Sequence, residues 1–108
     1  MPVAPVVWSL DAFWRGNREV TPWLTKPPSE YVYDHVRLTT QPFIEPDVPR
    51  HIEAMLEMVH ADRTLLFASD YPHWDTDDAT FIAPEIPERF RERVLAGNAV
   101  ETFGNRIL

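Results

Sequence analysis

The densest group of side chains able to do chemistry lies in residues 69–78 (SDYPHWDTDD), where four carboxylates and one imidazole occur within ten residues. A carboxylate such as that of Asp70 can bind a divalent metal ion or accept a proton from a metal-bound water molecule. Pro72 stiffens the turn, so we expect Asp70 and His73 to keep a defined relation. Trp74, beside them, is a candidate for lining a substrate pocket, and His73 and Trp74 together are candidate accessory or substrate-binding residues.

The same loop also has plainer interpretations. Serine and aspartate after a strand are ordinary turn and capping residues. The spacing Asp75-x-Asp77-Asp78 is similar to an acidic cation loop, but the glycine and distal glutamate of a helix–loop–helix calcium site are missing. A solvated acidic surface is therefore the simpler interpretation of these three residues. A cation-binding module built on residues 70–78 stays open as an alternative.

The elements that must position this loop are two predicted strands with a helix between them. Residues 64–68 (TLLFA) form a nearly continuous apolar run, which is typical of a strand covered on both faces of a parallel sheet. Residues 35–40 (HVRLTT) alternate and are rich in β-branched types, which also predicts a strand. Residues 48–61 predict a helix capped by Asp47, whose apolar face carries Ile52, Met55, Leu56 and Val59.

This order implies a parallel pair joined by a right-handed crossover. The loop at 69–78 then lies at the carboxyl end of a parallel strand, where ligands and catalytic groups gather in α/β folds. Two parallel strands alone leave unpaired edges and do not make a stable sheet. The chain therefore looks like a segment of a larger α/β protein.

Shorter elements are expected on either side. Residues 1–8 are expected to be irregular or strand-like, with Ser9 capping a helix that ends at Gly16. After the acidic loop, Pro87 opens a helix that ends at Gly97, and Asn98 caps a last helix.

Composition excludes several classes of function. The 108 residues include no cysteine, which rules out disulfides, a thiolate nucleophile and cysteine zinc sites. A net charge of −7 disfavours nucleic-acid binding, which needs clustered cations. The apolar N-terminus has no basic residue and does not look like a signal peptide, and no run is long enough to span a membrane. We therefore expect a soluble, cytoplasmic protein that binds neither nucleic acid nor membrane.

Residues 66–75 (LFASDYPHWD) resemble the last barrel strand and following loop of the amidohydrolase-related proteins, the amidohydrolase 2 group. That group includes aminocarboxymuconate-semialdehyde decarboxylase and related carboxylate decarboxylases. Residues 28–31 followed by 36–42 are similar to the family's segment into the penultimate strand. Residues 97–99 with 103–104 are similar to its closing helix, so the resemblance covers most of residues 9–105.

The resemblance implies a C-terminal fragment of a metal-dependent TIM (β/α)8 barrel, in which about two parallel strands and the closing helices are present. The last barrel strands would lie at about 35–40 and 64–69, and the closing helices at about 87–105. Asp70 maps onto the family's last-strand aspartate, which is a metal ligand or catalytic proton acceptor. The implied cofactor is a divalent metal ion, typically zinc. The implied reaction is hydrolysis of a C–N or C–O bond, or decarboxylation, of a small-molecule substrate.

The chain departs from the family pattern in its ligands. The His-x-His of the first strand is absent, and the histidines of the fifth and sixth strands have no counterpart. A catalytic zinc ion typically takes three protein ligands, and a complete barrel needs at least ~200 residues. We therefore expect the chain to be inactive alone, from a truncated or split gene, and to supply Asp70 to a site completed by another copy of itself or by a chain carrying the rest of the barrel. The alternative is a non-catalytic barrel remnant that acts as an oligomerising or partner-binding module.

Overall fold

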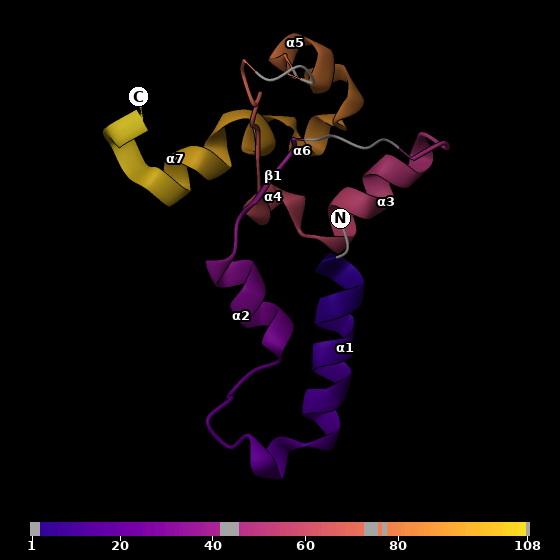
Figure 1. Ribbon diagram of the computed structural model, residues 1–108, viewed down its shortest axis with the longest axis vertical. Helices are drawn as coiled ribbons and strands as arrows, with labels where there is room; N and C mark the ends of the chain where they lie inside the picture. Colours follow the sequence, from indigo (N-terminus) through magenta and orange to yellow (C-terminus); the bar gives the residue numbers. More distant parts are fainter. Residues whose placement is uncertain (1–2, 42–45, 73–75, 77, 108) are drawn as a thin grey trace. The chain divides into compact units, whose positions relative to one another are not determined.

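The computed structural model describes residues 3–41, 46–72, 76 and 78–107. The chain forms two compact units, residues 1–36 and residues 37–108. Figure 1 shows the elements of each unit, coloured along the chain.

The first unit is a pair of packed helices. Helices α1 (Val3–Gly16) and α2 (Pro28–His35) contact each other and are connected through a short 3-10 turn, η1 (Arg18–Val20). Figure 1 shows the two helices side by side. Ala4 and Val7 of α1 and Tyr33 of α2 are buried.

The prediction for the N-terminal residues was wrong, although α1 does end at Gly16 as expected. The helix starts at Val3 and not after Ser9. Pro5 is compatible with this because it lies in the first turn, where backbone N–H groups have no partner inside the helix. Ser9 does not cap the helix, since its hydroxyl donates to the Pro5 carbonyl at 3.0 Å within the helix.

The second unit contains the expected parallel pair. Strand β1 (Leu38–Thr39) pairs in parallel with β2 (Leu65–Leu66), with Leu38 opposite Leu65. Both strands are shorter than the predicted ranges 35–40 and 64–69. His35 is the last residue of α2, and Thr64 ends a helical turn, α4 (Ala61–Thr64).

The crossover helix is also shorter than predicted. Helix α3 (Arg50–Met58) replaces the expected 48–61, and Asp47 does not cap it, because Pro49 occupies the N-cap position. His60 adopts a left-handed conformation (φ 54°), which separates α3 from α4. The predicted apolar face is largely right, because Ile52, Leu56 and Val59 are buried.

The C-terminal part of the unit is helical. It comprises α5 (Ala79–Ile82), the 3-10 turn η2 (Ala83–Glu85), α6 (Glu88–Glu92), the π-helical turn η3 (Arg93–Gly97), α7 (Asn98–Phe103) and the 3-10 turn η4 (Gly104–Ile107). Gly97 was expected to end a helix. Its φ of −56° is helical instead, so α6, η3 and α7 run on continuously until Gly104, which has a φ of 71°.

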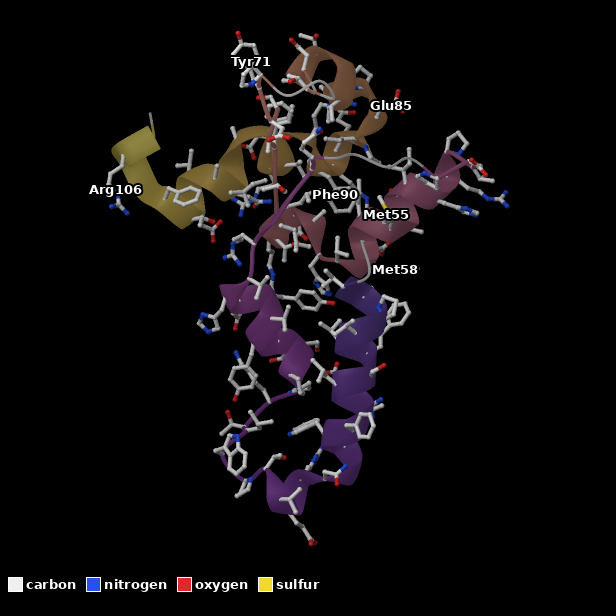
Figure 2. All side chains as sticks on the ribbon, in the orientation of Figure 1. Met55, Met58, Tyr71, Glu85, Phe90 and Arg106 are labelled. Atoms are coloured by element: carbon white, nitrogen blue, oxygen red, sulfur yellow. The ribbon has the colours of Figure 1, made fainter. Side chains whose placement is uncertain are left out.

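The core of this unit is made by β2 and the helices around it. Leu65, Ile86 and Val94 are completely buried, and Phe90 is nearly so. Figure 2 shows the Phe90 side chain within the unit. Among the described residues, no helix is both long and apolar enough to cross a membrane.

Candidate functional site

Asp70 lies just beyond the carboxyl end of β2, in the segment that leads from the strand into the acidic loop. Its backbone is left-handed, with a φ of 59°, and the residue is exposed. Aspartate enters this region more readily than most residues, because its short side chain can hydrogen-bond locally. Asp70 thus lies beyond the carboxyl end of β2, the end of a parallel strand at which α/β folds collect ligands.

One side of this segment is held by Thr40, the residue that follows β1. The Thr40 backbone N–H donates to the Leu66 carbonyl at 3.0 Å. The next hydrogen bonds to this segment come from the Thr40 side chain. The Ala68 N–H donates to Thr40 Oγ1 at 3.1 Å, and Thr40 Oγ1 lies 3.4 Å from the Ala68 carbonyl. Thr40 is 1% exposed, whereas Ala68 is half-buried.

The other side is held by the C-terminal helices. The Leu65 carbonyl accepts from Asn98 Nδ2 at 2.8 Å, and the same amide donates to the Ala61 carbonyl at 2.8 Å. The Phe67 N–H donates to the Val94 carbonyl at 2.9 Å, within the π-helical turn. The buried Asn98 side chain therefore connects α7 to α4 and β2. The prediction that Asn98 caps a helix was wrong. Together these bonds fix the backbone on which Asp70 is carried.

The turn after Asp70 is open to solvent. The Tyr71 N–H donates to Ser69 Oγ at 3.3 Å, and Thr76 Oγ1 donates to the Asp70 carbonyl at 3.4 Å. Tyr71 is 80% exposed, and Figure 2 shows its side chain at the outer edge of the unit. The predicted accessory residues His73 and Trp74 lie outside the described residues, as do the carboxylates of Asp75 and Asp77.

Asp78 serves as a helix cap. Its Oδ1 accepts from the Thr80 N–H at 2.7 Å and from Thr80 Oγ1 at 2.6 Å, at the start of α5. The hydrogen bond from the Thr80 hydroxyl, and then that from its backbone N–H, lower the pKa of Asp78 below its ordinary value of 3.8. Because Asp78 Oδ1 already accepts these two hydrogen bonds, Asp78 suits a structural role better than a role in binding a cation.

Arginines anchor the helices that flank the site. Arg89 of α6 bonds two carboxylates of α3, Glu53 at 2.8 Å and Glu57 at 3.4 Å, which raises the pKa of the guanidinium. Arg91 donates to two backbone carbonyls, Ala83 at 2.8 Å and Ile86 at 3.0 Å, and so fastens the turn η2 to α6.

A sequence profile of the amidohydrolase family matches residues 5–104. The chain belongs to the amidohydrolase family. No curated protein matches the chain. Amidohydrolase domains are typically TIM barrels, and the parallel pair with its surrounding helices is compatible with a fragment of one. The more specific resemblance to the carboxylate decarboxylases stays a prediction.

The family is generally metal-dependent, so the donor set of this chain can be compared with what a metal centre needs. Asp70 offers a suitable oxygen ligand at the strand end. Within residues 3–41, 46–72, 76 and 78–107, however, no three histidine, aspartate or glutamate side chains are placed to hold one ion. These residues therefore fit as one contributor to a metal site and do not form a complete one.

The sequence predicted Asp70 but not the residues that hold its backbone. Thr40 was only one β-branched residue within the predicted strand 35–40, and Asn98 was predicted to cap a helix. Their bonds join positions 28 and 33 residues apart in the chain, and no local pattern reveals such pairs.

Proposed function

We propose that this chain is the C-terminal part of a metal-dependent, amidohydrolase-like hydrolase or decarboxylase and contributes Asp70 to its metal site. The observation that carries the proposal is the family match over residues 5–104, combined with an exposed aspartate on a fixed backbone just beyond a parallel strand. The chain alone is inactive, because its described residues do not complete a donor set.

In this proposal the other metal ligands come from histidines on a second chain that supplies the remaining barrel strands, or on another copy of this chain. The bound divalent ion, of the zinc type, supplies Lewis acidity toward a small-molecule substrate. Asp70 holds the ion or accepts a proton, and His73 and Trp74 are accessory or substrate-binding residues. The substrate carries a C–N or C–O bond to be hydrolysed, or a carboxylate to be removed, and the complex acts in the cytoplasm.

Co-expression tests this function. The genes next to that of this chain are searched for a polypeptide with a His-x-His strand, the chain is co-expressed with it, and the zinc content of the co-purified complex is measured by mass spectrometry. We expect about one zinc ion per complex for the wild type and much less for Asp70→Asn. Asp78→Asn is the matched control, because asparagine is also a good helix cap. A complex that holds no zinc, or equal zinc in Asp70→Asn, would refute the proposal.

A second candidate function is self-association without catalysis, and exposed apolar side chains in the first unit favour it. Phe13 is 72% exposed, Trp23 is 70% exposed and Val20 is 66% exposed. Exposed apolar side chains on neighbouring stretches of one helical unit would suit an interaction surface if they form one patch. Sedimentation of the isolated chain decides this case: a stable homo-oligomer that binds no zinc would favour the second function, and a monomer would exclude it.

A further inference from the structure

Thr40 is the buried polar side chain that connects the end of β1 to the segment leading to Asp70. Thr40 follows β1 and is 1% exposed. Its backbone N–H makes the last main-chain bond to β2, at the Leu66 carbonyl. The hydroxyl then contacts both backbone polar groups of Ala68. The Thr40 hydroxyl therefore supplies the next hydrogen bond between the two segments, at the position where main-chain pairing has ended.

A hydroxyl group suits this position because it can accept one hydrogen bond and donate another. At 3.1 Å the Ala68 N–H makes a normal bond to Thr40 Oγ1, and the return contact of 3.4 Å is weaker. Valine has nearly the same shape as threonine but lacks both functions, whereas serine retains both. Comparing threonine, valine and serine at position 40 thus distinguishes the effect of the hydroxyl's hydrogen bonds from the effect of side-chain volume.

The consequence concerns Asp70, two positions further along the chain. Without the Thr40 hydroxyl, the Ala68 N–H would lose its hydrogen bond, and the tie between the end of β1 and the segment that leads to Asp70 would be lost. The bond from the Phe67 N–H to the Val94 carbonyl, on the side of the C-terminal helices, would remain. A left-handed residue such as Asp70, with a φ of 59°, persists where its surroundings determine the backbone. A carboxylate that ligates a metal must be held to within a fraction of an ångström.

We propose that Thr40 is a positioning residue for Asp70: its hydroxyl replaces the missing main-chain bond to Ala68 and so fixes the backbone that aims the carboxylate. This inference rests on the proposed function, because it assigns the residue that orders the metal ligand. Thr40 itself touches neither metal nor substrate.

The test has two arms, which use Thr40→Val and Thr40→Ser. The first arm is NMR of the isolated chain. We expect the wild-type Ala68 amide to exchange slowly with solvent, and Thr40→Val to speed this exchange and to shift the Asp70 backbone resonances toward random-coil values. Thr40→Ser should keep both properties. Ile52→Val, a buried substitution in α3, controls for a general loss of stability.

The second arm is the zinc affinity of the co-expressed complex. Thr40→Val should weaken binding by about tenfold, the low end of the range for changes behind a metal ligand. Thr40→Ser and Ile52→Val should stay within about threefold of the wild type, well below that effect.

The two arms separate failure of the inference from failure of the proposed function. A wild-type complex without zinc would refute the proposed function. The NMR measurements would still decide whether Thr40 orders the Asp70 backbone. If Thr40→Val leaves the Asp70 resonances unchanged, or binds zinc as the wild type does, the inference is wrong. If Thr40→Val fails to fold, exchange in the wild-type chain decides, because an Ala68 amide that exchanges as fast as an exposed loop amide would overturn the proposal.

Discussion

Asn98→Ala should destabilise the second unit more than any exposed polar substitution. The Asn98 amide, 1% exposed, donates to the carbonyls of Ala61 and Leu65 at 2.8 Å each. The Ala61 carbonyl keeps a second donor, the Leu65 N–H, after the substitution. The Leu65 carbonyl faces away from β1 and would lose its hydrogen bond within a buried region.

The magnitude follows from these two losses. One lost bond to a carbonyl that stays paired costs about 1 kcal/mol, and one buried carbonyl left unpaired costs about 1–3 kcal/mol. The substitution also removes Asn98 Oδ1, which is buried without a hydrogen-bond partner, and this returns about 1 kcal/mol. We therefore expect the free energy of unfolding to fall by about 2 kcal/mol. For a domain of this size, about 2 kcal/mol corresponds to a melting temperature lower by about 8–16 °C.

Urea unfolding followed by far-ultraviolet circular dichroism measures this change. The midpoint should fall while the slope of the free energy against urea stays the same. Asn17→Ala is the matched control, because the exposed Asn17 amide donates to one carbonyl, Phe13, at 2.8 Å. The control should lose about 0.5 kcal/mol or less. Equal losses in Asn98→Ala and Asn17→Ala would refute the role given to Asn98.

Three other predictions concern the ends and surface of the helices. Gly104→Ala should cost about 1–3 kcal/mol in thermal unfolding, because φ 71° and ψ −164° lie in a region that essentially only glycine occupies; an unchanged melting temperature would contradict this. Thr80→Val should raise the pKa of Asp78 toward 3.8 in an NMR titration of its carboxyl carbon, since the Thr80 hydroxyl lowers that pKa. A pKa of Asp78 that does not move on this substitution would be inconsistent with the cap. In the wild type, the stabilisation from Asp78 is complete above pH 3.8 and is lost as the pH falls through the lower folded-state pKa. Arg91→Ala should cost about 1.5–3 kcal/mol with little dependence on salt, because its two partners are neutral carbonyls. Arg89→Ala should cost less stability than Arg91→Ala, and that cost should shrink in high salt, because its partners are exposed carboxylates; the reverse order of the two costs would be evidence against this assignment.

The parallel pair could be predicted from the sequence because its signal is local. An apolar run at 64–68 and an alternating run at 35–40 flank a helical pattern, and this order specifies a parallel crossover. The strand bounds could not be predicted. The strands start later than predicted because α2 runs to His35 and α4 runs to Thr64. They end where main-chain pairing is replaced by the bond between Ala68 and the Thr40 side chain, 28 residues apart in the chain.

The N-terminal helix was missed for a different reason. Two prolines before Ser9 weigh against a helix in any local pattern, yet Pro5 is harmless in a first turn. Asp70 could be proposed from the sequence because a carboxylate after a buried strand is a local signal, and its role as a ligand stays a prediction. The bonds that hold its backbone involve Asn98 and Val94, whose contacts arise only when the last helices fold onto β2.

We propose that Asp70 binds the metal ion of an amidohydrolase site shared with another chain. The most direct measurement is a crystal structure of the co-expressed complex with diffraction data collected at the zinc absorption edge. We predict an anomalous peak about 2.0–2.2 Å from an Asp70 carboxylate oxygen, with histidines of the other chain as the remaining ligands. A zinc ion bound only by other residues, with the Asp70 carboxylate turned away from it, would show that Asp70 is not a metal ligand.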